Sequence, residues 1–252
     1  MNSKAAILYF HSIDDYPLSV SVEAFKKQIR WLYERSYSGC CMRDIRNELS
    51  SAKEVAITFD DCLESIYENA VPILSQFGFK ATFFATVEYV GKTRWGSVKH
   101  QRWSDERTGD FNVPFRYMDW DQLKSLVESG MEIGAHMITH CNLTDLSKQE
   151  QEKEIAGSKE ILEEKLGIEV EAFSYPRGKF DDGIVDIVKA AGYKAACTTA
   201  AGYVTEQSDA LRLDRFAGGK FNMEFKSVFC PKYRLICDFK NFAKQTLKRM
   251  LK

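Results

Sequence analysis

The chain has 252 residues, of which 44% are hydrophobic and 28% are charged, and its formal net charge is −1. A chain of this length buries enough apolar surface to fold without a structural metal or a disulfide. The near-neutral charge argues against a protein that binds nucleic acid over its whole surface, so we expect no nucleic-acid partner. The seven cysteines contain no CxxC pair, which leaves no sign of a zinc ribbon or a redox motif.

The apolar run at 5–10 is too short for a signal peptide. The sequence also contains no run of about 18 apolar residues that would predict a membrane-spanning helix. Free cysteines without an export signal are typical of cytoplasmic proteins. We therefore expect a cytoplasmic location, with the inner membrane surface as an alternative.

Short apolar runs alternate with stretches of helical periodicity along most of the chain. In chain order, the sequence predicts a strand at 5–10, a helix at 22–37, a strand at 55–59, a helix at 64–77, a strand at 81–87, a helix at 119–129, a strand at 131–135, a helix at 147–166, a strand at 170–175, a helix from 181 or 182 to 191, and strands at 193–198 and 211–216. Strands separated by helices indicate an α/β fold with a mostly parallel sheet covered by helices.

The segment 91–117 interrupts this alternation. It is polar and aromatic and shows no clear period, and its aromatic residues include Trp95, Trp103, Phe111 and Phe115. A long loop inside a compact domain is usually functional or disordered. We expect either a rim that contacts a ligand or a flap packed on the surface.

Several residues with chemically useful side chains fall just past the predicted strand ends. About seven βα units can close into a barrel, whose active site lies at the C-terminal ends of its strands. His11, Asp60, Asp61, His136 and Arg177 all occupy such positions. The predicted topology therefore gathers these residues at one end of a barrel.

Asp60 and Asp61 end a predicted buried strand as adjacent carboxylates. One can ligate a metal while the other accepts a proton from water, and like charges this close raise one pKa unless a cation intervenes. The structural alternative is a solvated turn, or a cap for the helix that follows.

His136 and His140 stand four residues apart after another predicted strand. On a helical turn this spacing places both imidazoles on one face, where they can bind one metal. Together with Asp61 they form three ligands that suit a catalytic zinc site with an open position, and also non-haem iron. The alternative is a pair of surface or core histidines.

Three motifs in this order resemble the polysaccharide deacetylase (NodB-homology) family. They are Thr-Phe-Asp-Asp at 58–61, His-x-x-Thr-His-x-x-Leu at 136–143, and Phe-Ser-Tyr-Pro-Arg-Gly at 173–178. The segments 119–123 and 130–134 are also similar to that family. The resemblance covers roughly residues 5 to 218 and implies a distorted (β/α) barrel of about seven parallel strands.

The resemblance also implies a reaction and a cofactor. Family members remove N-acetyl groups from amino sugars with a bound divalent metal. The family pattern makes Asp60 the general base, and it makes Asp61, His136 and His140 the metal ligands. Zinc is the metal we expect, with iron, cobalt, nickel or manganese as alternatives.

The third motif implies the substrate pocket. Tyr175, Pro176 and Gly178 should line it, and the backbone N–H of Arg177 should help to hold the oxyanion. We also expect Trp120, in the segment that resembles the family at 119–123, to contact substrate.

This sequence departs from the family pattern in three places. Cys62 stands where glycine is usual, and its side chain would crowd the pocket or change the turn. Ser174 stands where many members carry an arginine that orients the base, so we expect Arg177 to stabilise Asp60 from another direction.

The third departure concerns the general acid, because no histidine follows His140, whereas many members supply a late one. The first and last strands of a closed barrel are neighbours, so His11 could replace the missing group. The structural alternative is a histidine that bonds a backbone group at the barrel mouth.

The C-terminal segment 231–252 differs from the rest of the chain, and we take 1–230 as the barrel domain. From residue 232 onward there are seven basic residues and a single acid, Asp238, and the apolar residues share one face of a predicted helix. Such a helix can lie on an anionic membrane surface. Packing against the barrel is the alternative.

The sequence therefore predicts a metal-dependent hydrolase that removes an N-acetyl group from an amino sugar in a cell-envelope or capsular glycan precursor. Nucleotide-linked and lipid-linked forms of this sugar are among the substrates that we expect. Two rival hypotheses are a deformylase or other amide hydrolase on the same scaffold, and a catalytically inactive barrel that binds glycans.

Overall fold

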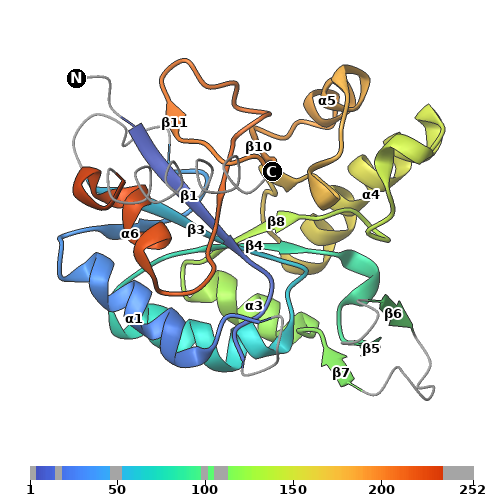
Figure 1. The fold of residues 1–252 in the computed structure, drawn as a ribbon. Helices are drawn as coiled ribbons and strands as arrows, with labels where there is room; N and C mark the ends of the chain where they lie inside the picture. Colours follow the sequence, from blue (N-terminus) through green and yellow to red (C-terminus); the bar gives the residue numbers. More distant parts are fainter. Residues whose placement is uncertain (1–3, 15–18, 46–52, 98–101, 105–112, 235–252) are drawn as a thin grey trace, which may run out of the picture.

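The computed structural model describes residues 4–14, 19–45, 53–97, 102–104 and 113–234. One curled sheet dominates the molecule (Figure 1). Its strands are β1 (Lys4–Phe10), β2 (Ser38–Cys40), β3 (Glu54–Asp60), β4 (Thr82–Ala85), β8 (Glu132–Ala135), β9 (Ala172–Ser174), β10 (Ala195–Cys197), β11 (Val204–Thr205) and β12 (Phe216–Ala217). The order across the sheet is β10-β9-β8-β4-β3-β1-β11, with β2 beside β3 and β12 beside β1.

All pairings in this sheet are parallel except that of β1 with β11. The carboxyl ends of the parallel strands therefore meet along one edge. The expected α/β fold, a distorted barrel of parallel strands, is confirmed.

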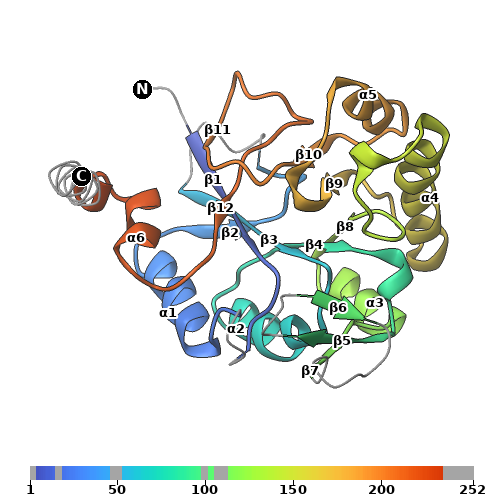
Figure 2. The same cartoon turned by 45° about the vertical axis from the view of Figure 1, so that its right-hand side comes forward.

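Helices wrap the outside of the curl in chain order (Figure 2). They are α1 (Val22–Tyr33), α2 (Val71–Gln76), α3 (Trp120–Glu128), α4 (Lys148–Leu166), α5 (Asp182–Ala190) and α6 (Met223–Phe229), and a π-helical turn at Ile66–Ala70 leads into α2. Two of the helices end on defined caps: Asp119 accepts from the backbone N–H of Gln122 at the start of α3, and Gly167 ends α4 at φ 67°. No helix in the described part of the chain is long and apolar enough to cross a membrane.

The alternation of side chains along β3 divides the core into two layers. Val55, Ile57 and Phe59 pack outward beneath the helices. Ala56 faces the opposite way, into the second cluster inside the curl. By the same period of two, Asp60 points into the interior of the barrel, where it is 2% exposed.

Gly134 in β8 allows the sheet to curl tightly at this point. A Cβ there would lie 2.5 Å from the ring of Phe84 and 2.9 Å from the carbonyl oxygen of Ala172. Only glycine leaves room for both neighbours, one of them a backbone atom that has no rotamer to change. This close approach keeps β8 and β9 together just before the residues of the candidate site.

The segment 91–117 contains secondary structure that the sequence did not reveal. It forms a three-stranded antiparallel sheet in the order β6-β5-β7, built from Arg102–Ser104, Thr93–Ser97 and Val113–Arg116. The expected irregular loop is therefore wrong for these residues. Gly96 and Pro114 interrupt the pattern, and Pro114 is tolerated because β7 is an edge strand.

The predicted last strand is shorter than expected, because only Phe216–Ala217 forms a strand there. The residues before it still join the two ends of the curl. Leu213 donates its N–H to Ala196 on one side, and Gly218 donates to Tyr9 on the other. This segment thus closes the barrel between β10 and β1.

The predicted C-terminal helix lies almost wholly outside the described residues. Residues 231–234 are helical, and the rest of the segment stays a prediction, as does a domain boundary at residue 230.

Candidate active site

The carboxyl ends of three strands bring the expected ligands together. Asp60 ends β3 and Asp61 follows it, while His136 comes directly after β8 and Ser174 ends β9. Sequence separations of more than 70 residues between the carboxylates and the imidazoles thus become direct contacts.

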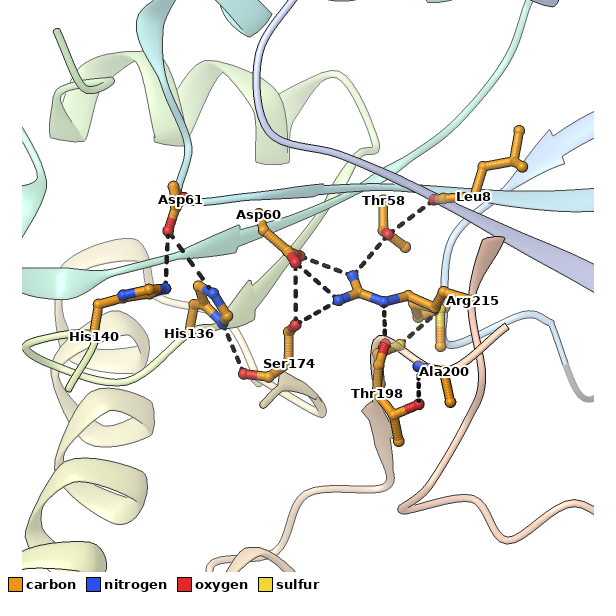
Figure 3. Close-up of polar contacts among 12 residues, drawn as sticks. Leu8, Thr58, Asp60, Asp61, His136, His140, Ser174, Thr198, Ala200 and Arg215 are labelled. Atoms are coloured by element: carbon orange, nitrogen blue, oxygen red, sulfur yellow. Dashed lines mark hydrogen bonds and ion pairs between the residues drawn. The ribbon is translucent and has the colours of Figure 1, made fainter. Parts of the chain in front are cut away.

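Asp61, His136 and His140 form a compact group in which one ligand atom from each lies within 4.8 Å of the others. Nε2 of His136 lies 3.8 Å from Oδ1 of Asp61, and Nε2 of His140 lies 3.6 Å from the same oxygen (Figure 3). That buried oxygen has no hydrogen-bond partner among the described residues. Buried polar atoms are rarely left unsatisfied, so this oxygen fits a ligand to a cation.

Both imidazoles are suited to bind a metal through Nε2. Nδ1 of His136 lies 2.7 Å from the carbonyl oxygen of Ser174, which requires the proton on Nδ1 and leaves the lone pair on Nε2. Burial, followed by the neighbouring His136, lowers the pKa of His140 to about 4. A neutral imidazole is the form that ligates a metal.

The two histidines do not share a helical turn, so that expectation is wrong. Residues 136–140 form an irregular loop in which Met137 and His140 have positive φ values of 69° and 57°. The loop bends at residues 138–139, and the centroids of the two rings lie 4.8 Å apart. The two imidazoles, four residues apart, are therefore brought together by an irregular loop and not by a helix.

A second unusual turn follows β3. Asp61 and Cys62 both have positive φ, at 70° and 55°. This conformation explains why glycine would suit position 62, since the left-handed region costs other residues roughly 1–2 kcal/mol. The Cys62 side chain is 2% exposed and belongs to the core between sheet and helices. It therefore does not crowd the pocket.

Asp60 is held by Arg215, which sequence reasoning did not identify. Nη1 of Arg215 donates to Oδ1 of Asp60 and Nη2 donates to Oδ2, each over 2.8 Å. The guanidinium also donates to the hydroxyls of Thr58 and Ser174 and to the carbonyl of Thr198 (Figure 3). Arg215 is fully buried, so this bidentate pair is shielded from water.

The pair sets the charge of Asp60. Burial by itself would raise the pKa of this carboxyl, but the Arg215 guanidinium and His136 outweigh burial and hold the pKa well below its usual range. Asp60 is therefore an ionised carboxylate inside the barrel.

The structure overturns the expected role of the Arg177 side chain towards Asp60. Arg177 is exposed and lies in the turn after β9 with a φ of 59°, whereas Arg215 occupies both carboxylate oxygens. One signal in the sequence could have found Arg215. Arg215 stands two residues after Leu213, so in an extended segment the two side chains share one face. The side chain of Leu213 faces the barrel interior.

The remaining predicted site residues lie around this centre. Tyr175 is fully buried, its hydroxyl donates to the carbonyl of Leu211, and its ring stacks on Phe180 at 4.5 Å, so its side chain packs the core. Pro176 is buried and Gly178 has a φ of 64°. Their contact with substrate stays a prediction.

Two predicted site residues, His11 and Trp120, lie next to helix and strand ends, and the contact of Trp120 with substrate stays a prediction. Trp120 is partly buried at the first turn of α3. His11 is exposed just past β1, and its ring lies edge-on to Tyr9 at 5.8 Å. The Arg215 guanidinium lies 4.7 Å from the same Tyr9 ring, so His11 borders the Asp60 network. Its role as acid is not tested by this arrangement.

The family model for polysaccharide deacetylases matches residues 48–196, a range that includes both carboxylates, both histidines and the third motif. This chain belongs to the polysaccharide deacetylase family.

Individual deacetylases are similar to this chain over most of its length. The poly-beta-1,6-N-acetyl-D-glucosamine N-deacetylase of Staphylococcus epidermidis is 25% identical over 205 residues, which cover 78% of this chain and 67% of that protein. The protein YxkH of Bacillus subtilis (strain 168), which carries the name polysaccharide deacetylase, is 27% identical over 84% of this chain and 71% of its own length.

The fold is shared with a solved deacetylase. The structure of the Streptococcus pyogenes deacetylase PplD in complex with acetate aligns with a TM-score of 0.73 and 25% identity, over 90% of this chain and 97% of that one. The resemblance inferred from three short motifs thus extends over the whole barrel of this polysaccharide deacetylase.

Proposed function

We propose that this polysaccharide deacetylase removes an N-acetyl group from an amino sugar by metal-assisted hydrolysis. The observation that carries the proposal is the group of Asp61, His136 and His140 beside an ionised, arginine-bound Asp60. The acetate bound to the Streptococcus pyogenes deacetylase supports an acetyl substrate over the formyl alternative.

The donor set favours zinc. One carboxylate and two imidazoles with an open fourth position are typical of catalytic zinc sites, while iron, cobalt, nickel and manganese remain alternatives with similar ligands. When bound, such a metal polarises the amide carbonyl and acidifies a water molecule.

Asp60 would accept the proton from the attacking water. Its bond to Arg215 keeps it ionised but also makes it a weak base, because both oxygens already accept strong hydrogen bonds. It can therefore deprotonate only a water whose own pKa has been lowered. The exposed His11 would protonate the departing amine, and the backbone N–H of Arg177 would hold negative charge that develops on the amide oxygen.

The substrate we propose is an N-acetylated amino sugar of a cell-envelope or capsular glycan. The Staphylococcus epidermidis protein, named for poly-beta-1,6-N-acetyl-D-glucosamine, supports an N-acetylglucosamine unit. A nucleotide- or lipid-linked form of the sugar would suit the cytoplasmic location that we propose from the free cysteines.

Metal content and acetate release test this function together. Protein purified without chelators should contain about one metal per chain and release acetate from N-acetylglucosamine oligomers or from nucleotide-linked N-acetylglucosamine. His136→Ala should lose both properties, because it removes the ligand whose tautomer the Ser174 carbonyl sets. Glu152→Ala, at an exposed position on α4, should keep both. Wild-type protein that takes up no metal after reconstitution would contradict the ligand assignment.

We also propose that the basic segment 232–252 contacts an anionic membrane surface. Its seven basic residues against one acid support this. In co-sedimentation with vesicles that contain phosphatidylserine, the full chain should pellet and a chain truncated before Asp238 should not. Equal pelleting of both chains would contradict the proposal.

A further inference from the structure

The loop that carries both histidine ligands has an unfavourable local conformation. Met137 and His140 both occupy the left-handed region, at φ 69° and 57°. Each such residue costs roughly 1–2 kcal/mol, so the loop keeps this shape only if its surroundings impose it. The question is which contacts do so, because the shape places Nε2 of both histidines beside Asp61.

One set of contacts comes from the short helix Val87–Tyr89. Donor groups of this helix bind the carbonyl oxygens of the loop. The N–H groups of the loop must therefore find their acceptors in another part of the protein. The N–H of Val87 donates to Met137 over 3.1 Å, the N–H of Glu88 donates to Ile138 over 2.9 Å, and the hydroxyl of Tyr89 donates to Thr139 over 3.1 Å.

Glu154, in the middle of α4, satisfies the opposite side of the loop. Its Oε2 accepts the backbone N–H of Ile138 over 3.0 Å and that of Thr139 over 2.9 Å. Its Oε1 accepts the hydroxyl of Thr139 over 2.9 Å. One side chain thus fixes two consecutive peptide groups immediately before His140.

The Glu154 carboxylate serves the loop and not an ion pair. It is partly buried, and no lysine or arginine in the described part of the chain lies within ion-pair distance of it. Both of its oxygens are therefore available to accept the hydrogen bonds of the loop. At Gly157, one turn later, α4 approaches the loop so closely that a Cβ would lie 3.0 Å from Ile138.

We propose that Glu154 is a positioning residue of the metal centre. Its carboxylate holds the backbone at 138–139 in the conformation that brings His136 and His140 to one side of Asp61. The inference rests on the metal site of the proposed function, but metal affinity tests it without any substrate.

Two conservative changes at this position separate the effect of side-chain length from the effect of charge. Glu154→Gln loses the charge and keeps the length, because its amide oxygen can accept both N–H groups while its NH₂ donates to the Thr139 hydroxyl. Glu154→Asp keeps the charge but is one methylene too short to span the same bonds. Glu154→Ala removes both. Glu152→Ala is the matched control, since Glu152 on the same helix is exposed and, among the described residues, forms an ion pair with Lys148 alone.

The experiment measures zinc affinity of the full chain by competition with a chromophoric chelator. We expect Glu154→Ala and Glu154→Asp to weaken zinc binding by roughly 10- to 100-fold, as loss of a group that orients a ligand typically does. Glu154→Gln should bind zinc nearly as well as the wild type, and Glu152→Ala should be unchanged. A merely structural glutamate would lower the melting temperature of the metal-free protein in its variants without this pattern in affinity.

Wild-type affinity in both Glu154→Ala and Glu154→Asp would overturn the proposal. So would a Glu154→Gln variant that binds as weakly as Glu154→Ala, because charge and not hydrogen bonding would then be responsible. If Glu154→Ala fails to fold, Glu154→Asp decides alone. A wild type that binds no zinc would instead remove the metal centre, which is a separate result.

Discussion

Replacing Asp60 with asparagine should lower kcat for deacetylation by about 10²- to 10⁴-fold, the usual contribution of a general base. The amide has almost the same shape but accepts no proton from water. The substitution leaves Asp61, His136 and His140 in place. Zinc content should therefore stay at the wild-type level while acetate release falls, which mass spectrometry and a coupled acetate assay can measure on the same sample.

The control for this prediction must account for stability. In Asp60→Asn the buried Arg215 keeps its charge and loses its carboxylate, so the variant should also be less stable. Assays well below its melting temperature separate the two effects. A folded, zinc-loaded Asp60→Asn protein with wild-type kcat would contradict the role of Asp60 as base.

Replacing Arg215 with methionine should destabilise the protein by about 3–5 kcal/mol at neutral pH, because it leaves the buried Asp60 carboxylate without its partner. Chemical denaturation in the presence of a chelator measures this loss. The double variant Asp60→Asn/Arg215→Met should recover much of the stability, because it removes both charges together, but it should remain inactive. Additive losses in the double variant would show that the pair is not coupled.

The destabilisation in Arg215→Met should depend on pH. In the wild type the pKa of Asp60 is depressed, so the pair stabilises the fold above the unfolded-state pKa, about 3.9, and this contribution is lost as pH falls below it. In the variant the Arg215 contribution is absent, while burial still opposes the ionised form of Asp60. The difference in stability between the two proteins should thus be greatest near neutral pH and shrink as pH is lowered.

Most of the fold could be predicted from local sequence patterns. The run Val55 to Phe59 is apolar except for Thr58 because β3 is buried on both faces. The helices carry their own caps at Asp119 and Ser147. These signals depend on neighbours in the chain, so they can be recognised without the tertiary structure. The short strands between residues 93 and 116 could not be recognised in this way, because Gly96 and Pro114 fall inside them.

The candidate site could likewise be predicted only in part from the sequence. The sequence by itself determined that Asp61, His136 and His140 follow strand ends of a parallel sheet, where strand ends converge. Only the tertiary structure decided which residue holds Asp60, because Arg215 reaches it across 155 positions through the closure of the barrel. The tertiary structure also decided the conformation of the loop 136–140, since contacts with α4 and the Val87–Tyr89 helix hold its left-handed residues. Contacts that depend on how a sheet closes and what packs against a loop leave no periodic trace in the chain.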